Sequence, residues 1–466
     1  MTQRRDATAK LMMSSAVVWL VLAITLGLIQ AWEFIAPDLF SGISWLVFSR
    51  LRPAHVNGLA FGWLSMAMVA GWYYVVPRLT KTEIFSETLG VVVAWVWNVA
   101  LSVGVVGLTL GWTQSREYAE LAWPIDVVIL IALLLTGVNL FTTIARRKEP
   151  NLYVSLWYIM GTLLWFPIVF ALGNVIWAPP TGALMGLNDS IWNWFYGHNI
   201  LGLWFTTGTV ALIYFIIPRE IKKPIYGYTL ALIAFWGIAF FYTAVGTHHI
   251  LGAPVPEWLK TVAVISSIGL LIPVIAFIVN IFMTMRGSWR VAYRSIPLRF
   301  VLTGTFFYLM VSLQGSFQAL RNFNQFIHFT NWTVAHAHLA LLGFVAFSMW
   351  GMAYYIMPRI LDVPLHSERL AWIHWWLTFG GFLGFFSVLT AAGLVQAGGF
   401  AQGIPIVQIL PGIHDLFVAR AAIGTVIIGA QYIFAHNMRR TVLDARKAHP
   451  ADKPLSAHAE ALAADE

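Results

Sequence analysis

The chain has 466 residues, of which 59% are hydrophobic and only 10% are charged. Soluble domains carry about 25% charged residues, so this composition excludes an ordinary water-soluble fold. The formal net charge of +8 could point to nucleic acid, but the basic residues stand in short groups between apolar stretches. We therefore expect membrane lipid, and no nucleic acid, as a partner.

A helix that spans a membrane needs about 20 mainly apolar residues, and stretches of that length recur along the whole chain. In chain order they predict spans at 12–36, 54–78, 88–112, 123–145, 153–177, 192–218, 226–247, 259–285, 299–320, 332–358, 370–394 and 414–437. The expected fold class is an all-α integral membrane protein, a bundle of about twelve transmembrane helices. We expect one transmembrane domain over residues 1–440.

The basic residues predict how this bundle is oriented. Of the 28 Lys and Arg residues, 22 fall in loops on the side of the N-terminus and 6 on the other side. Because positive charge gathers on the inner side of a membrane, we expect both termini to be cytoplasmic. Residues 441–466 are rich in Ala, Asp, Glu and Lys and predict a disordered cytoplasmic tail. No internal repeat is evident, which disfavours a transporter built from inverted repeats.

The chain contains no cysteine. This excludes disulfides, thiolate-bound metals and iron–sulfur clusters within the chain. It also excludes covalent haem attachment through a Cys-x-x-Cys-His motif. Any metal must therefore use histidine, carboxylate or other oxygen ligands.

Six histidines lie within or at the ends of predicted spans. They occur in the stretches Arg-Pro-Ala-His-Val-Asn-Gly, Tyr-Gly-His-Asn, Gly-Thr-His-His and Ala-His-Ala-His, as His55, His198, His248, His249, His336 and His338. Ionisable residues inside a membrane are costly, and they indicate a functional site by default. One such histidine would be weak evidence, whereas six at these spacings are strong evidence for a site.

Two of these histidines stand on opposite sides of one helix. Residues two apart on a helix project about 200° apart, so His336 and His338 can each face a different planar cofactor. If His338 faces His55, the pair would hold one haem iron from both sides, as in an electron-transfer haem. His336 would then bind a second haem from one side only and leave its other side open to a small ligand.

The remaining three histidines predict a further metal site over that open side. His198, His248 and His249 offer three nitrogens, which suit copper, zinc or non-haem iron. Tyr242 lies six residues before His248 on the same predicted span. Its phenol could supply an electron and a proton to a bound substrate, although a tyrosine at the membrane interface is the simpler interpretation of such a residue alone.

With these residues in view, the chain resembles the catalytic subunit I of haem-copper oxygen reductases, in particular the C-type or cbb3-type branch. The resemblance covers about residues 41–440 and rests on Tyr-Gly-His-Asn, on Phe-Tyr followed by His-His, and on Asn-Trp-Thr before His336. In other branches the tyrosine stands four residues after the first copper histidine. Here that position is Gly202, so the resemblance assigns the role to Tyr242.

The resemblance implies two haem b groups, one copper and a reaction. His55 and His338 would ligate low-spin haem b, and His336 would ligate high-spin haem b. His198, His248 and His249 would bind copper, with Tyr242 cross-linked to His198. The enzyme would be a cytochrome c oxidase of a bacterial inner membrane, reducing O2 to water with electrons from one or more cytochrome c subunits, with or without proton translocation. Two outer-loop acids, Glu117 and Glu120, resemble the family's calcium-linked pair, and carboxylates suit calcium.

Several polar positions depart from the family pattern. On the seventh span Tyr226 and Tyr228 are present, but the expected serine and histidine are Ala231 and Ala234. Tyr308 and Ser312 remain as polar positions on the ninth span. The acid expected near the proximal histidine is Gln314, and an expected aspartate is Asn331. We assign Tyr226, Tyr228, Tyr308 and Ser312 to the proton path. We assign Gln314 and Asn331 to the tuning of the haem.

Two alternatives stay open at the level of sequence. A nitric oxide reductase of the same superfamily would carry non-haem iron in place of copper and would use NO as substrate. Such enzymes place a glutamate where this chain has Gly202, and they lack the tyrosine. A proton-coupled multi-pass transporter would use the histidines as proton relays and would bind no haem.

Overall fold

The computed structural model describes residues 6–114, 116–175 and 185–449, and these ranges form helices joined by turns and loops. Twelve helical stretches of the described chain are long and apolar enough to cross a membrane, which confirms the predicted number of spans. They are α1 (Ala7–Glu33), α2 to α3 (Phe48–Thr80), α4 (Glu87–Leu110), α5 (Trp123–Ala145), α6 (Val154–Asn174), α7 to α8 (Gly186–Ile221), α9 with a 3₁₀ turn (Tyr228–Ile250), α10 to α11 (Glu257–Met285), α12 (Ile296–Gln318), α14 to α15 (Asn331–Leu361), α16 (Glu368–Ala401) and α17 (Ile406–Ala448). A short helix, α13 (Arg321–Ile327), precedes α14.

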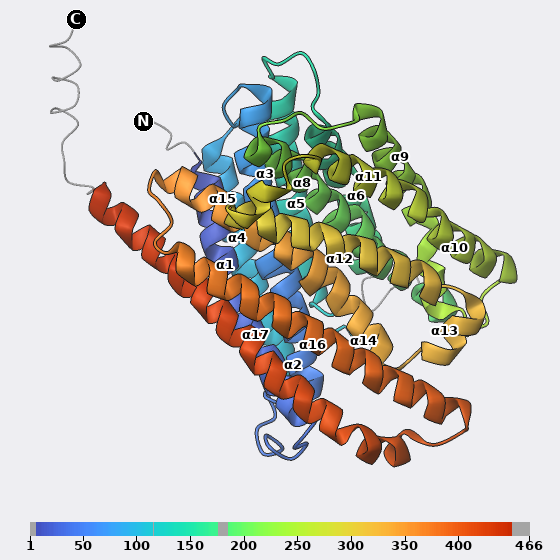
Figure 1. Cartoon of the computed structure of the whole chain (residues 1–466). Coiled ribbons are helices and arrows are strands. Elements are labelled where there is room, and N and C mark those ends of the chain that lie inside the picture. The colour runs from blue at the N-terminus through green and yellow to red at the C-terminus, as the bar shows by residue number, and fades with distance from the viewer. Residues whose placement is uncertain (1–5, 115, 176–184, 450–466) are drawn as a thin grey trace, which may run out of the picture.

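The two ends of the described chain lie on the same side of the bundle (Figure 1). We call this side the inner face and the opposite side the outer face. That the inner face is cytoplasmic stays a prediction, as does the single domain over residues 1–440. Helix α17 continues to Ala448, so residues 441–448 of the predicted tail are helical, in keeping with good helix formers such as Ala, Arg and Lys there. Residues 450–466 lie outside the described residues.

Three long spans form the centre of the bundle. Their most apolar windows are 83% to 94% buried, whereas other spans expose much of their surface toward the surrounding membrane. Each central span contains a π-helical stretch, and these are Gly58–Leu64, Ile200–Thr206 and Leu339–Ala346. Each stretch begins within three residues after one of the predicted ligand histidines. Extra backbone turns of this kind are frequent at functional sites, where they re-aim side chains.

The three central spans belong to a threefold structural repeat, which corrects the sequence analysis. In each repeat an asparagine of a later helix binds both the N–H and the carbonyl of one turn residue, and a threonine four residues further on accepts the preceding N–H. The equivalent residues are Asn139 with Ser86 in the first repeat, Asn280 with Gly227 in the second, and Asn437 with Ser367 in the third. The threonines are Thr143, Thr284 and Thr441. The matching residues are few and lie far apart, so no repeat is visible in the sequence.

The repeat also closes the centre of the bundle at the inner face. Tyr74, Phe215 and Tyr355 pack edge to face in a triangle with ring centroids 6.1 to 6.2 Å apart. Four residues after each ring, an arginine lies over it; these are Arg78, Arg219 and Arg359. The three follow Pro77, Pro218 and Pro358, as expected for arginines that anchor helix ends at a membrane interface.

The asparagine clamps make a stability prediction. Asn139 is fully buried and also donates to the hydroxyl of Tyr73 at 3.2 Å. Asn139→Ala leaves the Ser86 N–H without its acceptor and removes one of the two donors to the Ser86 carbonyl, and we expect it to lower the free energy of unfolding by about 1 to 3 kcal/mol. Thermal unfolding in detergent measures this, with the exposed Ser102→Ala as control. Equal stability of the two variants would contradict the role of the clamp.

Candidate metal centre

One internal cavity collects four of the predicted ligand histidines and the tyrosine. His198, His248, His249 and His336 line it, together with Tyr242. They come from α7, the 3₁₀ turn Gly246–Ile250, α14 and α9, which are far apart in the sequence. The remaining wall is mostly aliphatic and aromatic, with a few hydroxyl side chains such as Tyr308 and Ser312.

Three imidazoles in the cavity form a compact cluster. One nitrogen from each of His198, His248 and His249 lies within 4.8 Å of the others, and this is the one group of three or more such ligands found among the described residues. Their ring centroids are 4.6 to 5.2 Å apart. Three neutral imidazole nitrogens converging on one point are the donor set of a copper, zinc or non-haem iron site.

The hydrogen bonds of the cluster show which imidazole nitrogens are engaged. Nδ1 of His198 and Nε2 of His249 face each other at 2.9 Å, and one of them carries the proton unless both turn their lone pairs to a shared metal ion. His248 turns its Nδ1 to the hydroxyl of Ser267 at 2.7 Å. That hydroxyl donates to the carbonyl of Ala263, so it accepts from Nδ1 and leaves Nε2 of His248 free for a metal.

The backbone of the 3₁₀ turn directs the neighbouring His248 and His249 toward the cluster. Gly246 starts the 3₁₀ turn so close to α7 that a Cβ there would lie 2.5 Å from the carbonyl oxygen of Trp194. The indole of Trp194 stacks on His249 with centroids 4.1 Å apart and planes 7° apart. Close approach of the turn and stacking together fix the orientation of His249 toward His198.

Tyr242 fills the space that Gly202 leaves open. Its ring lies 5.4 Å from that of His198, centroid to centroid. A Cβ built on Gly202 would lie 2.0 Å from Cδ1 of Tyr242, well inside van der Waals contact. A larger residue at position 202 and the observed position of Tyr242 therefore exclude each other.

His336 faces the same cavity from α14. Its Nδ1 lies 3.1 Å from Oε1 of Gln314, so the amide oxygen accepts the Nδ1 proton and Nε2 stays free. Asn331, the other predicted tuning residue, instead binds Oε1 of Gln396 on α16 through its backbone N–H and its side-chain amide. Of these two residues, Gln314 contacts a predicted ligand and Asn331 binds Gln396 instead.

His55 and His338 do not line this cavity, but each is also oriented by a hydrogen bond at Nδ1. Nδ1 of His55 donates to the carbonyl of Ala23 at 2.7 Å, and Nδ1 of His338 donates to that of Val334 at 2.8 Å. Both therefore keep Nε2 free for an iron. Nearby, Arg420 lies over the rings of Phe34 and Phe385, and Phe385 packs on His338 at 5.0 Å. Nε and Nη1 of Arg420 are buried and, within the described chain, have no hydrogen-bond partner.

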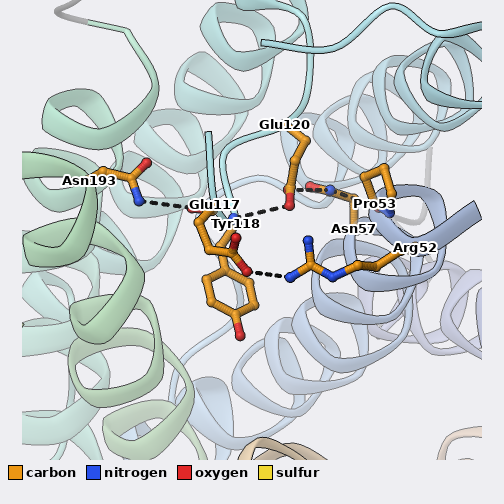
Figure 2. Close-up of polar contacts among 7 residues, drawn as sticks. All are labelled: Arg52, Pro53, Asn57, Glu117, Tyr118, Glu120 and Asn193. Atoms are coloured by element: carbon orange, nitrogen blue, oxygen red, sulfur yellow. Dashed lines mark hydrogen bonds and ion pairs between the residues drawn. The ribbon is translucent and has the colours of Figure 1, made fainter. Parts of the chain in front are cut away.

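The two outer-loop acids are already engaged by donors (Figure 2). Glu117 forms an ion pair with Arg52. The oxygens of Glu120 accept from the side chain of Asn57 at 3.0 Å and from the backbone N–H of Tyr118 at 3.1 Å. These contacts fasten the loop to the helix that carries His55.

Burial raises the pKa of the Glu120 carboxyl, although the hydrogen bond from Asn57 and the charge of Arg52 oppose this shift. A carboxyl with a raised pKa in the folded state makes folding less favourable once it ionises. Glu120 therefore lowers stability at neutral pH, and this cost disappears as the pH falls toward its unfolded-state pKa. A cation at the loop would offset the cost.

The structure separates the residues of the predicted proton path. Tyr226 and Tyr228 are exposed at the inner end of α9, while Ala231 and Ala234 are fully buried above them. Tyr308 and Ser312 line the cavity, and the Tyr308 hydroxyl is buried with no hydrogen-bond partner among the described residues. The predicted proton-path residues thus lie in two groups, one at the inner face and one at the cavity. Between the two groups, α9 offers only apolar side chains at Ala231 and Ala234.

The comparisons with known proteins define the class. Residues 7–427 match the family model for cytochrome c and quinol oxidase polypeptide I, and the chain belongs to this family of haem-copper oxidases. Membership implies haem and copper as cofactors in general, and it disfavours the transporter alternative. The predicted membership of the superfamily is confirmed.

Individual relatives show which members of the haem-copper oxidase family this chain is similar to. The chain is 32% identical to the Cbb3-type cytochrome c oxidase subunit CcoN1 of Stutzerimonas stutzeri, covering 93% of this chain and 94% of that protein. It is also 25% identical to a nitric oxide reductase chain of Stutzerimonas stutzeri, over 86% of each protein. A solved heme-copper terminal oxidase dimer has a similar fold, with a TM-score of 0.75, 14% identity, and coverage of 94% of this chain and 84% of that one.

Sequence reasoning missed Ser267 and Trp194, which orient His248 and His249, and it missed Arg420, which lies over a ring that packs on His338. All three lie in ordinary-looking apolar segments, and their partners are distant in the sequence. No local pattern marks a serine that accepts a hydrogen bond from a histidine 19 residues earlier. The one available signal was Arg420, a charged residue inside a predicted span.

The contact of Gly202 with Tyr242 yields a prediction. We expect Gly202→Ala to displace the Tyr242 ring and lower the unfolding temperature and the metal content of the purified protein. Gly429→Ala is the matched control, because a Cβ at Gly429 meets nothing within 4 Å. The double variant Gly202→Ala/Tyr242→Ala should recover stability relative to Gly202→Ala alone. If Gly202→Ala behaves like Gly429→Ala, the proposed close packing is wrong.

Proposed function

We propose that this chain is the catalytic subunit of a terminal oxidase that reduces O2 to water with electrons from cytochrome c. The observation that carries the proposal is one cavity lined by a three-imidazole cluster, a single further histidine and Tyr242. A metal held by His198, His248 and His249 would face His336 across this cavity. The bound copper and high-spin haem b would supply the redox chemistry of O2 reduction at this place.

The residues around each predicted ligand suit these cofactors. His336 would hold high-spin haem b through its free Nε2, with Gln314 orienting the ring. His55 and His338 would hold low-spin haem b through theirs. Arg420 offers buried guanidinium nitrogens that have no partner among the described residues, and a haem propionate accepts from such donors. A neutral amide at Gln314 makes the His336 ring a weaker electron donor than a carboxylate would.

Tyr242 would act as the residue that gives an electron and a proton to the substrate in the cavity. Its ring lies beside that of His198, in line with the cross-link that the family resemblance implies. The same packing argues against the nitric oxide reductase alternative, since a glutamate at position 202 and Tyr242 could not share this space. Non-haem iron in the three-histidine cluster is therefore the second candidate, and copper is the first.

Protons would reach the cavity from the inner face through the second repeat. Tyr226 and Tyr228 would stand at the entrance, and Tyr308 and Ser312 at the end of this path. Tyr158 and Tyr214 lie between them, with ring centroids 5.9 Å apart. The alanines at 231 and 234 cannot relay protons, so this path depends on tyrosines and water. Proton pumping stays an expectation of the family resemblance.

The partners follow from the chemistry. No covalent haem site exists in a chain without cysteine, so one or more separate cytochrome c subunits would deliver the electrons. The twelve apolar helices make the chain a multi-pass membrane protein. We place it in the inner membrane of a bacterium, with both termini cytoplasmic, because its basic residues gather on the inner face.

A calcium ion at Glu117 and Glu120 remains part of the proposal. The cation would have to compete with Arg52 for Glu117, and it would relieve the cost of burying the Glu120 carboxylate. These two effects oppose each other, so only a binding measurement decides between a calcium site and an ion-paired loop.

The first test concerns the three-histidine cluster. We expect His248→Ala to lose copper and to lower O2 consumption at least a hundredfold, because two imidazoles bind the metal much more weakly than three. The reduced absorption bands of the low-spin haem should remain, since His55 and His338 are untouched. His436→Ala, at an exposed histidine of α17, is the control. Unchanged O2 consumption in the His248→Ala protein would refute the assignment.

The second test concerns calcium. If the site exists, added calcium raises the unfolding temperature of the unmodified protein and of Glu83→Gln, an exposed inner-face control, but not that of Glu120→Gln. Without calcium, Glu120→Gln should unfold at the same or a higher temperature than the unmodified protein, because a neutral amide avoids the burial cost. No response of the unmodified protein to calcium would remove calcium from the proposal.

A further inference from the structure

A buried histidine with a hydrogen-bond partner at each ring nitrogen lies apart from the metal centre. His374 on α16 is fully buried and belongs to the third repeat, between α15, α16, α17 and α12. None of the roles proposed above uses it. A buried imidazole without a ligand role needs partners for both ring nitrogens, and these partners reveal what the residue can do.

His374 has an equivalent position in each of the other two repeats. It stands seven residues after Ser367, the turn residue that Asn437 binds. The residue seven positions after the equivalent Gly227 of the second repeat is Ala234, where the family resemblance led us to expect a histidine. In the first repeat the same position is Val93. The third repeat therefore carries an imidazole at the place where the second repeat has lost one.

A directional hydrogen-bonded chain links His374 to the inner face. Tyr354 contacts the side chain of Asn437 at the inner turn, and its hydroxyl lies 3.0 Å from Nδ1 of His374. On the other side Nε2 of His374 lies 3.1 Å from Oε1 of Gln431. The amide nitrogen of Gln431 donates to Thr378 and to the carbonyl of Ile427, which fixes Oε1 as an acceptor. Nε2 therefore carries the proton, and Nδ1 accepts from Tyr354.

The surroundings of His374 offset part of the cost of a positive charge on its buried imidazole. Phe300, Phe434 and Trp350 enclose the imidazole with ring centroids 4.9 to 5.2 Å away. Aromatic rings within about 6 Å stabilise a cation, and Oε1 of Gln431 accepts from the charged ring as well. The direct partners of His374 are uncharged, and Arg299 of the packed helix α12 lies over Trp372 and Trp375. Burial itself opposes the charge, so the site suits transient protonation.

We propose that His374 is a proton-binding site of the third repeat, loaded from the inner face through Tyr354 when the haems are reduced. In the loading step the O–H bond of Tyr354 breaks, an N–H bond forms at Nδ1 of His374, and the tyrosine oxygen regains a proton that water carries in from the inner face. The net result is one imidazolium and one proton removed from the inner side. The inference rests on the proposed function, because electrons arriving at the haems are its trigger.

The packing connects this site to the haem ligands. Trp350 lies on the same long span as His338, and it packs against Trp63 at 6.1 Å. Trp63 follows His55 by eight residues, about 12 Å along its helix. The negative charge that haem reduction adds is therefore close enough, in a medium of low dielectric constant, to favour a compensating proton on His374.

The experiment measures proton uptake on anaerobic reduction of the purified protein, with a pH-indicator dye in weakly buffered solution. The unmodified protein should take up at least half a proton per molecule more than His374→Leu and His374→Gln. The glutamine variant can keep polar contacts with Tyr354 and Gln431 but cannot carry the charge. Tyr354→Phe should reach the same extent of uptake at least fivefold more slowly, because the proton donor is lost.

The control and the possible results of this experiment distinguish the proton-binding site at His374 from the proposed function. Val93→Ala, at the equivalent position of the first repeat, is the control and should match the unmodified protein. Equal proton uptake by the His374 variants and the unmodified protein, with reduced haem bands present in all, overturns the proton site alone. If His374→Leu loses its haem bands, His374→Gln and Tyr354→Phe still decide. Absence of reducible haem from the unmodified protein overturns the proposed function and this inference together.

Discussion

The site depends on hydrogen bonds that fix the Nδ1 side of buried imidazoles and leave Nε2 free. Four predicted ligands follow this rule, with the partners Ala23, Val334, Gln314 and Ser267 for His55, His338, His336 and His248. In a membrane interior no water replaces a lost partner, so each contact fixes both the tautomer and the orientation of its ring. His198 differs, because its Nδ1 faces Nε2 of His249.

The fold supplies these partners through its threefold repeat. Three buried central spans, each with a π-helical stretch after a histidine motif, bring side chains from distant segments to one cavity. The same framework has diverged in its polar interior. The second repeat has alanine at position 234, the third has His374, and Gly202 makes room for Tyr242. One scaffold thus carries different side chains at equivalent positions.

Much of this arrangement is predictable from the sequence. Hydropathy gave the twelve spans, and the spacing of His336 and His338 gave opposite faces of one helix, since both depend only on local periodicity. The repeat was missed because it is carried by a few residues, such as Asn139, Asn280 and Asn437, whose partners are turn residues about 53 to 70 positions away. Ser267 and Arg420 were missed for the same reason, because only tertiary packing gives them partners or isolates them.

The central claim is that the three-histidine cluster holds copper for O2 reduction. Metal analysis of the purified protein, combined with turnover of O2 and of NO, tests it most directly. The account predicts one copper with two haem irons per chain, and O2 consumption that exceeds NO consumption. A third iron in place of copper, with NO as the faster substrate, would contradict the account.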